Sequence, residues 1–265
     1  MKVLITGSLG RIASQIIPEL ADDFVLILTD VKSGEVAGLP VSPLDITDYH
    51  AVVAATKGVD AILHLAIASQ RDIITNKTLF DRDEGEEYLA FNDLTIETNI
   101  RGTYHLFEAA RRNQVTRVVY GSSLTIYLGS PAYETIHDEL PPRPHNFYAL
   151  SKLWGEQIGE WFSRKHGLRV YCLRFGTPHP QPDVPEFTGW LKNPRAVATF
   201  VTYSDLASAM KAALLAEGPR FGAYTIVSAK SGNIFDLSKS IEIHWQPRDF
   251  IESDGTITPA LKPTE

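Results

Sequence analysis

Cysteine is nearly absent from this 265-residue chain, which contains Cys172 alone. A single cysteine excludes an internal disulfide and any metal site built from several thiolates. Because it lies in the apolar run "LRVYCLRF", we expect a buried structural thiol and not a nucleophile. The histidines His137, His145 and His179 lack the spacing of metal ligands, so we expect no metal site.

Long apolar runs and an excess of positive charge are missing as well. The apolar part of the N-terminal "MKVLITGSLG" is too short for a signal peptide, and no later run reaches the length of a membrane span. The chain has 25 Lys and Arg against 32 Asp and Glu, a net charge of −7. This balance argues against a nucleic-acid-binding protein and against a basic membrane-surface protein. We therefore expect a cytoplasmic protein without a nucleic-acid or membrane partner.

What the chain does contain is the composition of a soluble globular protein, 44% hydrophobic and 22% charged. Its first half alternates nearly continuous apolar runs with amphipathic stretches, which is typical of a parallel sheet covered by helices on both faces. The predicted strands are 2–6, 24–30, 59–66, 115–123 and 168–175, and the predicted helices are 10–20, 47–56, 94–113 and 146–166. The predicted fold class is α/β, a Rossmann-type doubly wound parallel sheet with a small C-terminal substrate-binding lobe.

Two segments interrupt the alternation. Residues 69–93 are polar and contain the acidic cluster "DRDEGEE", which indicates a solvated surface insertion, although an insertion after a strand can also form a lid. The Pro-rich "GTPHPQPDVPEF" follows Arg174 and interrupts the alternation of strands and helices a second time. We therefore predict a cofactor domain over residues 1–176 and a small substrate lobe over residues 177–265, interleaved with the last sheet elements.

Several conspicuous aromatic residues are interpreted as packing residues. His64 ends an apolar strand, which favours a packed histidine over a ligand. The four tryptophans are also expected to pack and not to form stacking platforms; they are Trp154, Trp161, Trp190 and Trp245.

The segment "LITGSLGRIASQI" follows the first predicted strand and begins the first predicted helix. Gly7 and Gly10 permit a tight turn and a close approach of the backbone to a pyrophosphate, and Ala13 is small enough for close packing of helix on strand. Asp30 ends the second predicted strand, where an acid can bind the adenosine ribose. Its carboxylate would repel a 2′-phosphate, so we predict NAD in preference to NADP, with Lys32 nearby weakening the preference.

Seven motifs stand in a characteristic order between Met1 and Asp205: "TGSLGRI", "LDITD", "ILHLA", "ETNIRGTYHLFEAA", "VVYGSS", "YALSK" and "FVTYSDLA". In these the chain resembles the extended short-chain dehydrogenase/reductases, the NAD-dependent epimerase/dehydratase family. The resemblance implies cofactor contacts at Gly7, Leu9, Gly10, Arg11, Ile12, Asp30, Asp45, Ile46, Leu65, Ala66, Ile67, Asn99, Tyr148, Lys152 and Phe175. Among these, Asn99 corresponds to the structural asparagine of the family. It also implies a homodimer formed through the two long helices.

The same resemblance implies a catalytic role for the "YALSK" segment. Ser123 precedes Tyr148 by 25 residues, as the catalytic serine does in the family, and Tyr148 and Lys152 share one helix face. A phenol has a pKa near ~10, so a tyrosine base at neutral pH needs a shift of roughly three units. The Lys152 cation and a positive nicotinamide are expected to supply that shift. Ser123 is expected to hydrogen-bond the substrate oxygen.

The family carries out oxidation, epimerisation and dehydration. Dehydration is disfavoured because Leu124 and Thr125 replace the acidic pair that the dehydratases carry beside the serine. The short chain, "HPQP" and "HWQPRD" are similar to the uronate dehydrogenase subgroup, which implies substrate contacts at Ser69, Ser123, Leu124, Thr125 and Thr177. Glu186 departs from that subgroup, which has an arginine for the substrate carboxylate there.

We therefore predict an NAD-dependent dehydrogenase that oxidises a hydroxyl of a small sugar-like molecule, with Tyr148 as the base. A nucleotide-sugar epimerase with tightly bound NAD is the alternative. A catalytically silent NAD-sensing regulator is the third hypothesis, and the intact Ser123, Tyr148 and Lys152 set argues against it.

Overall fold

A computed structural model describes residues 1–68, 86–127, 129–130, 135–180, 197–230, 234–252 and 254–259. An eight-stranded sheet, ordered β10-β7-β6-β5-β1-β2-β4-β3, forms its centre. The strands are β1 (Lys2–Thr6), β2 (Val25–Asp30), β3 (Gly34–Val36), β4 (Leu39–Pro43), β5 (Ala61–His64), β6 (Arg117–Ser123), β7 (Arg169–Phe175) and β10 (Phe221–Ile226). Every neighbouring pair is parallel except β3 and β4, which form an antiparallel hairpin at one edge.

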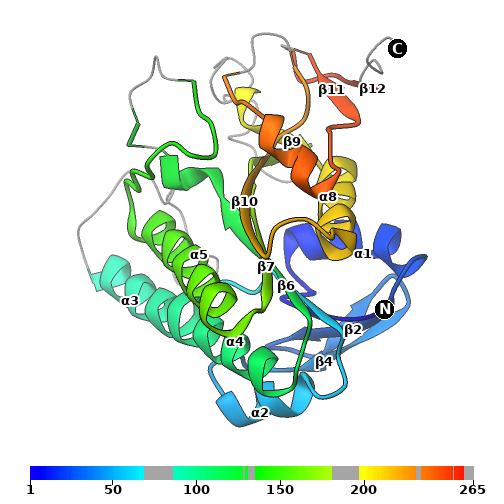
Figure 1. The fold of residues 1–265 in the computed structure, drawn as a ribbon, viewed down its shortest axis with the longest axis vertical. Helices are drawn as coiled ribbons and strands as arrows, with labels where there is room; N and C mark the ends of the chain where they lie inside the picture. The colour runs from blue at the N-terminus through cyan, green and yellow to red at the C-terminus, as the bar shows by residue number, and fades with distance from the viewer. Residues whose placement is uncertain are drawn as a thin grey trace.

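Helices cover both faces of this sheet (Figure 1). On one face, α1 (Arg11–Ala21) packs beside α8 (Tyr203–Leu215). On the other lie α2 (Tyr49–Ala55), α4 (Thr103–Arg112) and α5 (Phe147–His166). Helix α4 continues directly from α3 (Glu86–Thr95) through a π-helical segment, η2 (Ile96–Gly102). The doubly wound α/β sheet predicted from the sequence is therefore confirmed.

The alternation of side chains along each strand divides the core in two. Val3 and Ile5 of β1 pack with α1 and α8, whereas Leu4 between them packs with the α2, α4 and α5 layer. This follows from the period of two in a strand, and burial on both faces explains why the strands are apolar throughout. Cys172 is fully buried in β7, as expected for a structural thiol.

Smaller elements lie beyond the carboxyl ends of the strands. The pair β8 (Thr177–His179) and β9 (Phe200–Thr202) begins one residue after β7, and the hairpin β11 (Asp249–Ile251) and β12 (Ile257–Pro259) contacts the chain after β10. The 3-10 helices are η3 (Leu124–Tyr127) and η4 (Ser238–Ile243). No helix within the described ranges is long and apolar enough to cross a membrane.

Candidate cofactor and active site

The candidate site lies at one edge of the sheet, because its residues follow the carboxyl ends of neighbouring parallel strands. Gly7 follows β1, Asp30 ends β2, Leu65 follows β5, Ser123 ends β6 and Phe175 ends β7. The strand order reverses between β1 and β5, the position at which doubly wound sheets bind their ligands. The sequence-predicted residues of distant segments are thereby brought to one place.

The turn between β1 and α1 requires its glycines. Gly7 has a φ of 73°, and a Cβ on it would lie 2.7 Å from the Cα of Ala66, so no other residue fits. Gly10 is the N-cap of α1 and its N–H donates to the Gly7 carbonyl at 3.0 Å. No side chain caps this helix, and its first turn carries no acid. A first turn without a side-chain cap or an acid fits the binding of a dinucleotide phosphate at the start of α1.

Asp30 lies beside this turn. Its Oδ2 accepts a hydrogen bond from the Leu9 N–H at 3.0 Å, which fixes the carboxylate next to the glycines. Arg11 is exposed and Ile12 is half-buried at the start of α1. The predicted pyrophosphate and ribose contacts thus lie together.

The two residues predicted at the adenine have different surroundings. Asp45 is exposed, and its Oδ1 accepts from the backbone N–H (2.8 Å) and hydroxyl (2.7 Å) of Thr47. Ile46 is buried against η2, where a Cβ on Gly102 would lie 2.6 Å from its Cγ1. Asp45 therefore shapes the loop after β4, and Ile46 fixes that loop to the helix.

Asn99 joins the segment after β5 to α5. It is buried within the π-helical segment, and its Oδ1 accepts from the Ala68 N–H at 2.8 Å. Its Nδ2 donates to Ser151 Oγ at 3.0 Å, and that hydroxyl donates to the Tyr148 carbonyl at 2.7 Å. Leu65, Ala66 and the exposed Ile67 precede Ala68. These bonds tie the segment after β5 to the helix that carries Tyr148.

Tyr148 and Lys152 lie one turn apart near the start of α5, whose N-cap Asn146 accepts from the Ala149 N–H at 2.8 Å. Lys152 is buried, and its Nζ donates to the Gly121 carbonyl of β6 at 2.7 Å. The same Nζ is 5.8 Å from the centre of the Tyr148 ring and 5.1 Å from that of Tyr120. The cation and the phenol are therefore neighbours.

Ser123 points its hydroxyl into the same region. Its Oγ accepts from the Thr125 N–H (3.2 Å) and the Thr125 hydroxyl (3.0 Å) in η3, which leaves the proton of Ser123 to donate elsewhere. Thr125 is half-buried and Leu124 is buried beside it. Thr125 therefore holds the serine, whose own proton remains to be donated to an oxygen such as that of Tyr148.

Burial shifts both titratable groups of the pair. It raises the pKa of Tyr148 to about 12, against which a hydrogen bond with Ser123 acts. It lowers the pKa of Lys152 to about 7, while Glu156 raises it. The expected lowering of the Tyr148 pKa is thus not a property of the protein by itself. The physical reason is that Lys152 donates to Gly121 and lies over the ring instead of bonding to the phenol oxygen.

The remaining predicted contacts lie near β7. Phe175 is buried, and a Cβ on Gly121 would lie 3.1 Å from its ring, so the ring covers the strand that holds Lys152. The Thr177 hydroxyl is 3.0 Å from that of Thr199. Ser69, Glu186 and Trp190 lie outside the described residues. Among the residues that are described, no group of acids, histidines or cysteine is arranged for a metal ion.

His64 is a packed histidine, as interpreted from the sequence. Its Nδ1 is 2.7 Å from Thr6 Oγ1 and its Nε2 is 3.0 Å from Thr103 Oγ1. Burial and, to a smaller extent, the Lys152 cation together lower the pKa of His64 to about 3. Its neutral ring links β1, β5 and α4 directly below the cofactor turn.

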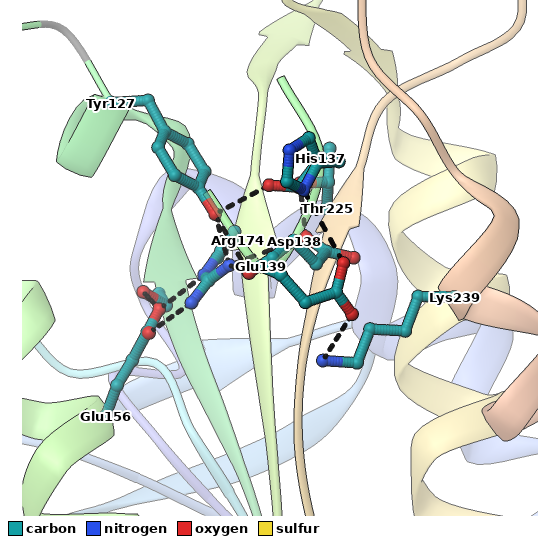
Figure 2. A network of polar contacts seen from close by, with 9 residues as sticks. Tyr127, His137, Asp138, Glu139, Glu156, Arg174, Thr225 and Lys239 are labelled. Carbon is teal, nitrogen blue, oxygen red and sulfur yellow. Dashed lines mark hydrogen bonds and ion pairs between the residues drawn. The ribbon is translucent and has the colours of Figure 1, made fainter. Parts of the chain in front are cut away.

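Sequence reasoning missed two buried charges, Glu156 and Arg174, which form the network in Figure 2. A pattern did point to them. Glu156 lies four residues after Lys152, on the face that also carries Tyr148, and Arg174 interrupts an apolar strand.

The fold and the site together define the class, a dinucleotide-binding sheet with a tyrosine–lysine pair at its switch point. Within that class the chain belongs to the NAD dependent epimerase/dehydratase family, whose model matches residues 3–179. Family membership, recognised from the motifs, and the NAD cofactor are thereby confirmed.

Three relatives narrow the comparison. The uronate dehydrogenase of Pseudomonas putida is 28% identical over 261 residues, covering 95% of this chain and 85% of the relative. The L-arabinose 1-dehydrogenase (NAD(P)(+)) of Haloferax volcanii is 27% identical, covering 94% and 96%. The crystal structure of uronate dehydrogenase from Agrobacterium tumefaciens superposes with a TM-score of 0.76 at 26% identity, covering 94% and 85%. All three are similar to this chain over nearly its whole length.

Proposed function

We propose that this protein is an NAD-dependent dehydrogenase that oxidises a hydroxyl of a small free sugar or sugar-like molecule. One observation carries the proposal: Ser123, Tyr148 and Lys152 meet at the carboxyl ends of the strands beside the Gly7–Gly10 turn and Asp30. The similarity to uronate and arabinose dehydrogenases supports the reaction type. The division into a cofactor domain (1–176) and a substrate lobe (177–265) is part of this proposal.

The chemistry that bound NAD would supply here is a hydride acceptor for the carbon that carries the hydroxyl. Tyr148 takes the proton of that hydroxyl, so the substrate loses one hydride and one proton. Ser123, held by Thr125, donates its hydrogen bond to the substrate oxygen as charge develops there. Lys152 supplies the cation beside the phenol, and Asp30 with the amides of α1 holds the cofactor.

The raised pKa of Tyr148 makes the proposed base dependent on the bound cofactor. With a pKa of about 12 the phenol stays protonated in the protein alone. Burial of a cationic nicotinamide nearby would favour the phenolate, so the base forms in the complex and not before it. This order protects the buried site from an uncompensated charge.

The proposed substrate class rests on the net charge of the protein and on the relatives. A net charge of −7 favours a small-molecule substrate over a nucleic acid or an anionic membrane surface. The curated relatives named above act on uronates and L-arabinose, which are free sugars. We propose the cytoplasm as its location, in keeping with the use of NAD and with a single buried thiol.

We also propose that the active form is a homodimer joined through η2, α4 and α5. These helices expose Tyr104, Trp154 and Trp161 at 47%, 52% and 44%, so the two tryptophans keep about half of their surface in contact with solvent, while Trp161 also packs on Phe162. Together with Ile100 and Phe162 they line an apolar hollow of about 410 Å³. An apolar face of this kind on an otherwise charged protein favours a second copy as its cover.

A substrate screen tests the function. Free neutral sugars, uronates and nucleotide sugars are each supplied with NAD and with NADP, and NADH or NADPH formation is followed by absorbance with product analysis. The proposal expects NADH formation with a free sugar or sugar acid, and a lower rate with NADP because of Asp30. Conversion of a nucleotide sugar without net NADH release, and no reaction with free sugars, would establish the epimerase instead.

A further inference from the structure

Arg174 occupies a buried position in β7, where its guanidinium grips a carboxylate with two parallel hydrogen bonds. Nε donates to Glu156 Oε1 at 3.0 Å and Nη2 to Glu156 Oε2 at 2.8 Å. Nη1 donates to the Asp138 carbonyl at 2.9 Å and also to the hydroxyl of Tyr127. Figure 2 shows the guanidinium between Glu156 on one side and Tyr127 and Asp138 on the other. A fork of this kind fixes its partner in position.

Glu156 is fixed from a second direction as well. The Ser122 hydroxyl donates to Oε1 at 2.5 Å, so two neighbouring strands hold one carboxylate that belongs to α5. Each holder is next to a proposed site residue, since Ser122 precedes Ser123 and Arg174 precedes Phe175. The carboxylate therefore joins the ends of β6 and β7 to the helix that carries Tyr148 and Lys152.

The position of Glu156 on α5 turns it toward the lysine. It is four residues beyond Lys152, so the two side chains lie one above the other on the buried face of the helix. Both are nearly inaccessible to solvent, at 2% and 3% exposure, where charges are screened little. Glu156 is also the nearest fixed anion on the helix that carries the proposed base.

We propose that Glu156 is a positioning residue for the Tyr148–Lys152 pair, an anion that Arg174 and Ser122 hold in place so that Lys152 keeps its charge inside the core. The inference rests on the proposed function, because the charged lysine matters through the tyrosine beside it.

The other groups that face Lys152 do not replace this anion. From β6 it meets the Tyr120 ring and the Gly121 carbonyl, and from α5 the Tyr148 ring. His64 of β5 is neutral, since its pKa is lowered to about 3, and Cys172 of β7 has a pKa raised well above its usual value by burial, so it is neutral too. Burial lowers the pKa of Lys152 and Glu156 raises it, as expected for a carboxylate one helix turn away from the ammonium.

Two substitutions distinguish an electrostatic role of Glu156 from a purely structural one. Glu156→Gln keeps the length and shape of the side chain and removes the charge. Glu156→Asp keeps the charge and shortens the reach to Arg174. If the pair only braces the sheet, Glu156→Asp is the more damaging change and neither affects Lys152.

The direct measurement is the titration of Lys152 itself, followed by NMR on protein with 13C-labelled lysine, with the signal assigned by its loss in Lys152→Met. We expect Glu156→Gln to lower the titration midpoint by about one pH unit, the size of a single charge at this range, and Glu156→Asp to leave it nearly in place. Glu156→Gln combined with Arg174→Gln removes both charges of the buried pair, so it should retain the fold and also lower the midpoint.

The pH profile of kcat/KM for NAD should show the same shift of the Lys152 pKa, because this ratio reports the ionisations of the free enzyme. A midpoint lowered by one unit reduces the charged fraction of Lys152 about tenfold at pH 8 and less than twofold at pH 6. The alkaline limb of the profile should therefore move to lower pH in Glu156→Gln and stay in Glu156→Asp.

Arg117→Lys is the matched control, a buried arginine of β6 that donates to the Leu214 and Ala216 carbonyls at the end of α8, away from the site. It should lower the melting temperature without moving the Lys152 midpoint. An unchanged midpoint in Glu156→Gln, or equal shifts in Gln and Asp, would overturn the inference. A lowered midpoint in a protein that oxidises none of the screened sugars would contradict the proposed function and leave the electrostatic role of Glu156 in place.

Discussion

At the scale of single residues, Tyr148 combines two demands that oppose each other. Burial beside Ser123 positions the phenol for proton transfer, and the same burial makes its ionised form unfavourable without the cofactor. In the proposed mechanism the tyrosine base therefore stays inactive until the positive charge of the cofactor stabilises its phenolate.

Tyr148→Phe should remove the base and little else. We expect kcat to fall roughly 10²- to 10⁴-fold, because general-base catalysis contributes on that order. NAD affinity, measured by calorimetry, should stay within about twofold, since the ring and the Lys152–Gly121 bond remain. An unchanged kcat in the Tyr148→Phe variant would mean that another group takes the proton.

His64 makes the folded state sensitive to acid. Its folded pKa of about 3 is below the unfolded value, so only the unfolded chain binds its proton between those pH values. The free energy of unfolding therefore falls as pH falls through this window, by about 2 kcal/mol between pH 8 and pH 5 for a group with an unfolded pKa near 6.5.

Urea denaturation at both pH values measures this effect. His64→Gln should lose about 2 kcal/mol of the pH dependence, although it is less stable than the parent at pH 8 because of its lost contacts. His50→Gln, on the exposed side of α2, is the control and should keep the parent dependence. The prediction would be contradicted if the free energy of unfolding changed by the same amount between the two pH values in His64→Gln and in the parent.

Residue by residue, the sequence could predict groups that belong to a local motif. Gly7, Gly10 and Asp30 can be predicted because a glycine-containing turn and an acid at a strand end are local sequence patterns. The Tyr148–Lys152 pair is readable because one helix turn separates them. Arg174 is not, because its reason for being in an apolar strand is a carboxylate on α5, and that neighbour exists only in the folded chain.

At the scale of elements, β1 and α5 were predicted well because their limits are encoded locally. Asn146 caps α5, and Gly167 ends it with a φ of 74°. The β3–β4 hairpin and β10 were missed, since β3 has three residues and β10 carries Gly222 and Ala223. The helix expected over 94–113 begins at Glu86 and contains the π-helical segment, which no 3.6-residue pattern describes.

Contact between α5 and β6 depends on Gly155, three residues beyond Lys152. A Cβ there would lie 2.2 Å from the hydroxyl of the buried Tyr120. Gly155→Ala should therefore destabilise the protein by about 1–3 kcal/mol, although alanine favours a helix, and should reduce kcat by displacing Lys152. Denaturant unfolding and steady-state kinetics measure the two effects.

Tyr120→Phe in the Gly155→Ala background is the control for that clash. Removal of the hydroxyl should restore only part of the lost stability, because Cζ and Cε1 of the ring would still lie 2.3 and 2.7 Å from the added Cβ. A Gly155→Ala variant as stable and active as the parent would show that α5 can shift without cost.

At the scale of the whole molecule, Trp154 and Trp161 on α5 provide the test of the proposed dimer. Trp154→Glu puts a charge into the proposed interface, so the dimer should dissociate to a monomer in light scattering after gel filtration. Ile241→Glu, at 65% exposure on η4, replaces an apolar residue that is more exposed than Trp154 at 52%, and it should not change the mass. A monomeric parent protein at micromolar concentration would refute the dimer.

The order of the strands also affects the growing chain on the ribosome. The centre of the sheet, β1, β2 and β5, is complete once residue 64 has been synthesised, and β6 can add to it by residue 123. Yet α8, which covers Leu63 and Val119 together with α1, begins only at Tyr203. A nascent chain halted between these points exposes an apolar sheet face, the surface that chaperones bind and that drives aggregation.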